Sequence, residues 1–227
     1  MEGLRRLSLE NIVNCRDLGG YPGTFGTTKF KRFLRCGIPL TPTQDDIVEL
    51  LKYGVGTVID LRGDWESEET PSVFRFLDSV DYHHVCLFEI NAAIDAEFDG
   101  TLEKSYEISI DNYKENYARE LNIIADAKEG CVLYHWFFGK DRTGMLTALL
   151  LHIAGVSPED IIADYQVSYT YLVSFIQREK NKSGSTMWET DESNFLSEPN
   201  NMASLLNYIN QKYGSVDGYL KEIGITE

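Results

Sequence analysis

The segment CVLYHWFFGKDRTGMLTALLLHIAGV, residues 131–156, constrains the fold more than any other part of the chain. Its first four residues are apolar and predict a buried strand, and the apolar run over 142–154 predicts a buried helix. Between them, Gly139 allows a sharp turn that can point successive backbone N–H groups into one concavity. The positive end of the following helix faces the same point. The segment therefore predicts an oxyanion-binding loop between a strand and a helix.

The charged residues of this loop limit the class of phosphate site. Arg142 can hold an oxyanion through two parallel hydrogen bonds. The nucleotide-binding pattern GxxxxGK[ST] does not fit, because no Gly lies five residues before Gly139 and Asp141 follows Lys140. The sequence thus excludes a nucleoside triphosphatase built on this loop.

Hydrophobic periodicity predicts strands that alternate with helices along the chain. The expected strands cover 29–35, 56–61, 83–88 and 131–135. The expected helices lie between Thr43 and Gly54, within 102–127 (one or two helices), over 142–154, after Ser157-Pro158, and over 201–214. This order is typical of an α/β domain with a largely parallel central sheet flanked by helices, whose ligands bind at the carboxyl ends of the strands.

We expect one domain over 1–227, with a possible lid or insertion at about 92–125 and a variable surface loop at about 178–200. The net charge of −15 argues against a surface for nucleic acid or anionic membranes. The chain has no apolar run of the roughly 18 residues that a membrane span needs, and 1–13 lack the apolar core of a signal peptide, so a cytoplasmic location is expected. The four cysteines form no CxxC pair, and we expect neither a metal nor a cofactor.

The segment HWFFGKDRTG, 135–144, resembles the His-Cys-x5-Arg-[Ser/Thr] signature of the cysteine-dependent protein tyrosine phosphatases. It is most similar to a bacterial branch that acts on phosphotyrosine and often on phosphoinositides. Four further stretches resemble motifs of that branch in the same order: NCRDLGGY at 14–21, VIDLR at 58–62, AGVSPEDIIADYQVS at 154–168, and KYGSVDGYLKEIGI from 212. The resemblance implies a cysteine-phosphatase fold, metal-free hydrolysis of phosphomonoesters through a phosphocysteine, and phosphotyrosine peptides or phosphoinositides as ancestral substrates.

The resemblance also implies roles for the residues that match. Arg142 would grip the phosphoryl group, His135 would help lower the thiol pKa, and Thr143 would support the thiolate as a leaving group. Asp141 matches a loop aspartate suggested as the general acid, and Lys140 adds a cation that would favour highly charged esters. The amide cradle would be supplied by Phe137, Phe138, Gly139, Lys140, Asp141 and Arg142, and the residues expected to brace the loop are Asn14, Arg16 and Asp17.

The decisive departure from the signature is Trp136, which stands where the nucleophilic cysteine is expected. An indole has no nucleophilic atom with a usable pKa, so no phosphoenzyme can form there. Cys131 cannot replace it, because it lies five residues upstream inside the predicted strand. Three explanations fit Trp136: a deliberate or accidental knockout of an active phosphatase, a natural pseudophosphatase that binds without turnover, or a decaying site in a structural protein. Cys and Trp codons differ by one base, and the intact neighbours suit the first explanation.

Other polar and aromatic residues have alternative readings. For Asp60 and Arg62 we expect one of two roles: a structural salt bridge near the site, or contact with the substrate. We expect solvated helix acids at Asp111, Asp160 and Asp164, and one buried helical stripe of Tyr106, Tyr113 and Tyr117. Two other functions stay open: a phosphate-site binding module, and an inositol polyphosphate phosphatase, which the charge of −15 disfavours.

Overall fold

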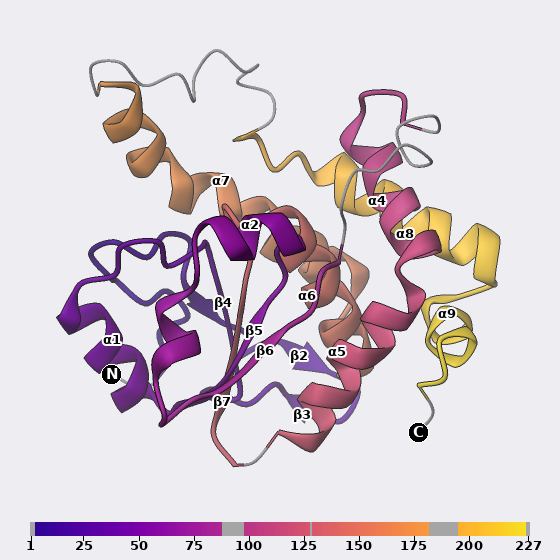
Figure 1. Cartoon of the computed structure of the whole chain (residues 1–227). Coiled ribbons are helices and arrows are strands. Elements are labelled where there is room, and N and C mark those ends of the chain that lie inside the picture. Colours follow the sequence, from indigo (N-terminus) through magenta and orange to yellow (C-terminus); the bar gives the residue numbers. More distant parts are fainter. Residues whose placement is uncertain (1–2, 88–97, 128, 182–194, 226–227) are drawn as a thin grey trace.

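The computed structural model describes residues 3–87, 98–127, 129–181 and 195–225. Within these residues the central sheet has five strands in the order β1-β4-β7-β5-β6 (Figure 1). β1 is antiparallel to β4, and the other neighbours are parallel. The strands are β1 (Arg16–Asp17), β4 (Phe33–Cys36), β5 (Val55–Asp60), β6 (Asp81–His84) and β7 (Cys131–His135), and a separate hairpin pairs β2 (Pro22–Gly23) with β3 (Gly26–Thr27). The expected largely parallel α/β sheet is confirmed.

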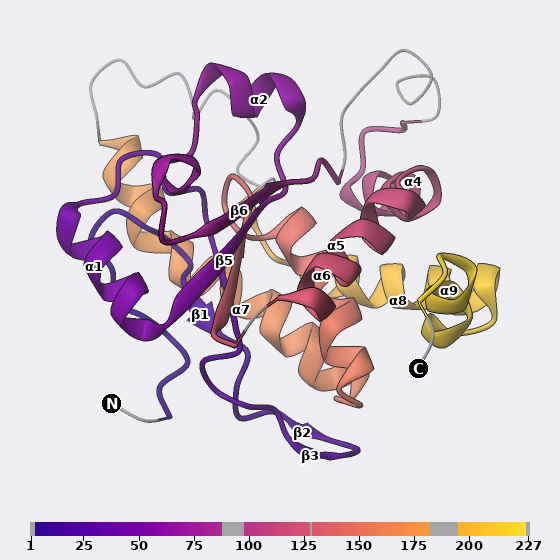
Figure 2. The same cartoon turned by 60° about the horizontal axis from the view of Figure 1, so that its bottom comes forward.

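Helices cover both faces of this sheet, as Figure 1 and its rotated view in Figure 2 show. α1 and η1 pack on one face through Leu50 and Phe74, and the opposite face is covered chiefly by α5 and α6. The bounds are α1 (Gln44–Tyr53), α2 (Asp64–Glu69), η1 (Val73–Phe76), α4 (Leu102–Asn112), α5 (Lys114–Asp126), α6 (Asp141–Ile153), α7 (Pro158–Lys180), α8 (Pro199–Tyr213) and α9 (Val216–Glu222).

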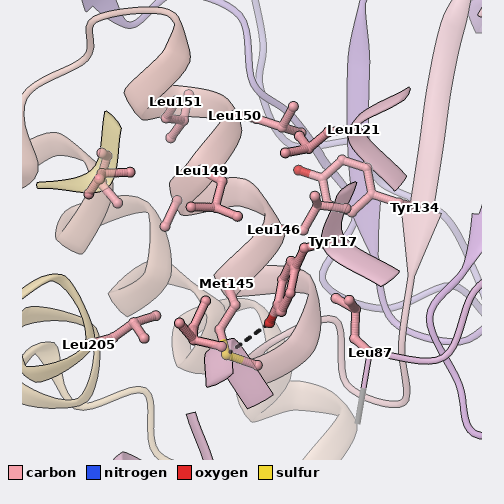
Figure 3. Packing of buried hydrophobic residues seen from close by; sticks show 14 of the residues in the cluster. Leu87, Tyr117, Leu121, Tyr134, Met145, Leu146, Leu149, Leu150, Leu151 and Leu205 are labelled. Atoms are coloured by element: carbon pink, nitrogen blue, oxygen red, sulfur yellow. Dashed lines mark hydrogen bonds between the residues drawn. The ribbon is translucent and has the colours of Figure 1, made fainter. Parts of the chain in front are cut away.

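Helix α6 is the centre of the larger apolar core. Every residue from Arg142 to Leu151 is buried, so the helix packs on all sides. Figure 3 shows Leu146 of α6 beside Tyr134 of β7 and Tyr117 of α5. Burying one leucine side chain contributes about 1.5–3 kcal/mol. This packing fixes the start of α6 against the end of β7.

Local sequence signals set several helix boundaries as expected. Thr43 accepts a hydrogen bond from the Asp46 amide, the Asp46 side chain bonds back, and Gly54 closes α1 in the left-handed conformation. The Ser157 side chain caps α7 by accepting a hydrogen bond from the Asp160 amide, with Pro158 in the first turn. The region 102–127 contains two helices, one of the two options predicted.

Other predicted boundaries were wrong. The strand expected at 29–35 begins only at Phe33, because Lys31 turns the chain with a φ of 62°. The strand expected at 83–88 is β6, which ends at His84; the next residue, Val85, donates to the Asp60 carbonyl and is buried without continuing the strand. Burial, which an apolar run signals, does not require strand pairing.

The two variable regions are only partly described. Of the loop expected at 178–200, residues 178–180 belong to α7 and residues 199–200 to α8, while 182–194 lie outside the described residues. Of the lid or insertion expected at about 92–125, residues 92–97 also lie outside the described residues, and most of the rest forms α4 and α5. In the described part of the chain, no helix is long and apolar enough to cross a membrane.

Candidate functional site

The loop after β7 lies at the carboxyl end of the central strand of the sheet, where it leads into α6. Gly139 turns the loop with a φ of 64°, and a Cβ there would lie 2.3 Å from the carbonyl carbon and oxygen of Cys36. The Gly139 amide closes the turn by donating to the Trp136 carbonyl at 2.8 Å. Only glycine satisfies both the backbone angle and the close approach of β4.

The side chains of Asn14 and Arg35 position the loop by donating hydrogen bonds to its carbonyl oxygens. The Asn14 amide donates to Phe138 O and Gly139 O, each at 2.9 Å. Arg35 donates to Gly139 O at 2.7 Å and to Lys140 O at 3.3 Å. In a planar trans peptide the N–H opposes the C=O, so the next amides, those of Lys140 and Asp141, point away from Asn14 and Arg35. This is the orientation that an amide cradle at a helix start requires.

Asp164 is the centre of the network behind the loop, and its assignment as a solvated helix acid was wrong. Its carboxylate is 2% exposed and pairs with Arg16 at 2.9 Å and Arg35 at 2.6 Å, and it accepts the Tyr21 hydroxyl at 3.0 Å. Burial alone would raise the pKa of Asp164, but the two guanidinium groups hold it well below its usual range. Its spacing of three residues from the buried Ile161 was the sequence signal for this position.

The three residues expected to brace the loop behave differently. Asn14 binds the loop directly, with a φ of 54°, and Arg16 donates to the Asn14 side chain at 2.5 Å. Asp17 does not contact the loop: it accepts the Gly19 and Lys31 amides and the Tyr53 hydroxyl. The prediction for Asp17 is therefore wrong, while Arg35, which the sequence analysis missed, takes that place.

Asp60 and Arg62 form the structural salt bridge that was one of the two alternatives. The pair is buried with an N–O distance of 2.7 Å. Burial alone would raise the pKa of Asp60, yet His135, Arg62 and Tyr82 lower it to about 2. Arg62 also donates to the carbonyls of Glu66 at 3.1 Å and of Thr70 at 2.7 Å, which positions α2 beside the loop.

Arg142 and Trp136 lie against each other at the mouth of the loop. The guanidinium carbon of Arg142 is 4.4 Å from the Trp136 ring centroid. The same side chain pairs with the carboxylate of Glu66 at 2.8 Å and donates to Leu61 O at 3.4 Å. Glu66, which was not predicted as a site residue, thus pairs with the arginine that the resemblance expects to grip phosphate.

Three residues around this position carry buried polar atoms without a hydrogen-bond partner in the described chain: both ring nitrogens of His135, the indole nitrogen of Trp136 and the hydroxyl of Thr143. Burial lowers the pKa of His135, although Asp60 lies 3.9 Å away and opposes the shift. An unpaired buried polar group costs about 1–3 kcal/mol, so the clustering of three such residues marks this position as a candidate binding site.

Lys140 and the two phenylalanines do not face a ligand. Lys140 is fully buried, donates to Leu196 O at 2.9 Å and lies 3.5 Å from the Asp141 carboxylate. Phe138 packs on Phe195, with ring centroids 5.1 Å apart, and Phe137 packs on Phe138. The role expected for Lys140, a cation that favours highly charged esters, gains no support from this buried position; its backbone and that of the two phenylalanines form part of the loop.

A pocket of about 360 Å³ opens between the loop, α2 and α4. The loop and α6 contribute Trp136, Asp141, Arg142 and Met145; the other lining residues are Trp65, Glu66, Phe98, Leu102, Ser105 and Tyr106. The expected single helical stripe of tyrosines is wrong, because Tyr106 lies in α4, Tyr117 in α5 and the half-buried Tyr113 between the two helices. The buried Tyr106 donates its hydroxyl to the Asp141 carboxylate and meets the Tyr165 hydroxyl at 2.8 Å. A second pocket of about 510 Å³ near Asp78 and Cys131 contains none of the predicted site residues.

Comparisons with known proteins agree with this architecture. A model of the tyrosine phosphatase family matches residues 7–227. A tyrosine-protein phosphatase of Nostoc commune is 28% identical over 196 residues, which is 82% of this chain and 67% of the relative. A candidate tyrosine-protein phosphatase of Cupriavidus necator is 30% identical over 175 residues, 73% of this chain and 63% of the relative. The chain thus matches about two thirds of the length of these relatives.

Among solved structures, P. aeruginosa TpbA in complex with pTyr is similar, with a TM-score of 0.45 and 15% identity over 86% of this chain and 87% of that one. The family model covers nearly the whole chain described above, including the loop, the bracing network and α6. The chain therefore belongs to the tyrosine phosphatase family.

Proposed function

We propose that this chain is a tyrosine-phosphatase scaffold whose catalytic step is disabled by Trp136. One observation carries the proposal: the indole lies at the end of β7 where the family signature has its nucleophile, and Arg142 stacks on it at 4.4 Å. An indole carbon or nitrogen cannot displace an alkoxide or phenoxide from phosphorus and later release phosphate. The chain as it stands is expected to be inactive.

The loop amides, Arg142, Asp141 and Thr143 are the groups that we propose would carry out phosphoryl transfer once a nucleophile stands at position 136. With a thiolate at 136, the loop amides and Arg142 would stabilise the charge on the transferring phosphoryl group. The thiolate would attack phosphorus, and the leaving oxygen would take a proton from Asp141, which Tyr106 orients. Water would then release phosphate from the phosphocysteine, with the Thr143 hydroxyl stabilising the departing thiolate. No metal is needed for these steps.

The pocket supports an aryl phosphate as the ancestral substrate. Its walls are mainly aromatic and aliphatic, and Trp136 and Arg142 form part of them. Such walls would contact a phenyl ring, whereas the short side chain of phosphoserine offers them no aromatic surface. We therefore propose phosphotyrosine peptides and phosphoinositides as substrates of the ancestral activity, with phosphoserine peptides poor.

The second candidate is a natural pseudophosphatase that binds a partner without turnover. The amide loop that Asn14 and Arg35 hold in place favours this candidate, because its amides could still bind a phosphorylated partner without turnover. Titration with inorganic phosphate separates the two ideas: the disabled enzyme is expected to bind it poorly because the indole fills the cradle. Sub-millimolar affinity would favour a phosphate-binding module.

The test of the proposed function is the reversion Trp136→Cys. The variant is expected to hydrolyse para-nitrophenyl phosphate without added metal and to be blocked by vanadate. Trp136→Ser empties the pocket without supplying a thiolate, so it is expected to stay inactive and regain phosphate binding. Trp136→Cys with Arg142→Ala is expected to lose the activity. A folded Trp136→Cys protein without metal-independent activity would contradict the proposal.

A further inference from the structure

Two cysteines lie opposite each other where β1 meets β4. In this antiparallel pair Asp17 is opposite Leu34, and the register continued to the residue before β1 sets Cys15 opposite Cys36. The Cys15 carbonyl accepts the Leu7 amide on the other side of β1, so it does not bond to β4. Opposed residues of this kind have Cα atoms about 4.5 Å apart, and disulfides need about 4.4–6.8 Å. The backbone therefore places the two cysteines at a separation that a disulfide requires.

The two side chains also meet on the same face of the sheet. Cys15, Leu34 and Cys36 belong to one apolar cluster, as the alternation of side chains along β4 requires. Cys15 is 2% exposed and Cys36 is fully buried, and both are free thiols. The thiol groups lie within hydrogen-bond range of each other; burial, together with the neighbouring Cys15, raises the pKa of the Cys36 thiol. The two sulfurs are therefore direct neighbours.

The other two cysteines are too far away to compete. Cys36 is opposite His135 at the end of β7, whereas Cys131 begins that strand. Four residues of strand span about 13 Å, beyond the reach of a disulfide. Cys86 follows β6, which is separated from β4 by β7 and β5. Among the four cysteines, all of which lie in the described residues, Cys15 and Cys36 are the pair within bonding reach.

This pair adjoins both side chains that position the loop after β7. Asn14, the residue before Cys15, donates to Gly139 O at 2.9 Å. Arg35, the residue before Cys36, donates to the same oxygen at 2.7 Å. The Cys36 carbonyl also forms the close contact that Gly139 permits. A covalent bond between the two sulfurs would fix the separation of the two backbone segments that carry Asn14 and Arg35.

We propose that Cys15 and Cys36 are a redox modification site, at which a small disulfide such as glutathione disulfide converts the two thiols into a bridge that stabilises the loop after β7. One cysteine sulfur attacks glutathione disulfide, which gives a mixed disulfide and releases one glutathione. The second cysteine sulfur attacks the protein sulfur of the mixed disulfide, which forms the bridge and releases a second glutathione. The cysteines lose two electrons and two protons, and the two glutathione molecules gain them.

The exchange is expected to be slow in the folded chain. The thiolate is the attacking species, and burial disfavours it, so reaction requires local opening of the segment around β1. The bridge does not involve position 136. The inference therefore stands or falls independently of the proposed function.

The test is incubation of the native chain in glutathione buffers at pH 8, followed by acid quenching, alkylation and peptide mass spectrometry. A parallel sample is refolded from urea in the same buffer, so that burial does not prevent equilibrium. A Cys15–Cys36 bridge that dithiothreitol reverses is expected in both samples, with Cys131 still a thiol. A bridge in the refolded sample alone also supports the site and assigns the delay to burial. Its absence from both samples, or bridges that join Cys15 equally to the other cysteines, overturns the proposal.

Variants and amide exchange test the effect on the loop. Cys131→Ala, the control for loss of a buried thiol, is expected to leave the bridge unchanged, and Cys36→Ala is expected to abolish it. In the bridged native chain, hydrogen exchange of residues 136–142 is expected to slow several-fold, with no change in α9. The melting temperature is expected to rise by roughly 5–10 °C, as for a disulfide that closes a loop of about 20 residues. Unchanged or faster exchange of 136–142 in the bridged chain would overturn the stated effect on the loop.

Discussion

Asp164→Asn is expected to destabilise the protein more than any other single carboxylate-to-amide change at the described site. The native carboxylate is 2% exposed and compensates two buried guanidinium groups, those of Arg16 and Arg35. The amide keeps a hydrogen-bond acceptor but removes the counter-charge. Breaking a buried ion pair by removing one partner costs about 3–5 kcal/mol. At about 2–4 °C per kcal/mol for a domain of this size, the melting temperature would fall by about 6–20 °C.

Urea unfolding followed by circular dichroism measures this change. The control is Glu159→Gln, which also removes one negative charge from α7 but at an exposed residue of the first turn. It is expected to change the free energy of unfolding by less than about 1 kcal/mol. Because the folded pKa of Asp164 is lowered, its stabilisation is present above the unfolded carboxyl pKa of about 3.9 and is lost as the pH falls below it. The difference between native and variant proteins is therefore expected to shrink toward pH 3. A loss below about 1 kcal/mol at pH 7 would refute the role of Asp164 as the compensating charge.

Two further substitutions test the loop itself. Thr143→Val removes a buried hydroxyl that has no hydrogen-bond partner in the described chain. The free energy of unfolding is therefore expected to stay within about 1 kcal/mol of the native value or to rise. A loss above about 2 kcal/mol would show that the hydroxyl is paired. Gly139→Ala places a Cβ 2.3 Å from the Cys36 carbonyl at a φ of 64°. Thermal unfolding is expected to show a loss of stability of about 2 kcal/mol or more. An unchanged stability would contradict the close approach of the loop to β4.

Local signals in the sequence predicted much of the fold. The Thr43 cap, the Gly54 stop and the Ser157-Pro158 start depend on neighbours within a few residues, and all three were confirmed. Gly139 was recognised for the same reason, because a tight turn before a helix is a local requirement. The order of the motifs along the chain predicted the family, and the family is confirmed.

Contacts between distant residues were harder to predict. Asp164 and Arg35 are 129 residues apart, so the spacing from Ile161 could indicate a buried acid but not which arginines compensate it. The direction of Lys140 depends on the segment near Leu196, and the pairing of Arg142 depends on where α2 places Glu66. Residue types predicted which chemistry was possible, while tertiary packing decided which charges were compensated.

The central claim is that a phosphatase site surrounds Trp136 and lacks only its nucleophile. Its most direct test is acid quenching of the Trp136→Cys variant during turnover of para-nitrophenyl phosphate, followed by mass spectrometry of the peptide that contains position 136. The account predicts one phosphoryl group on that cysteine, absent from the native chain and from the variant that also carries Arg142→Ala. A folded, alkylation-competent Trp136→Cys protein that never carries phosphate at position 136 would contradict it.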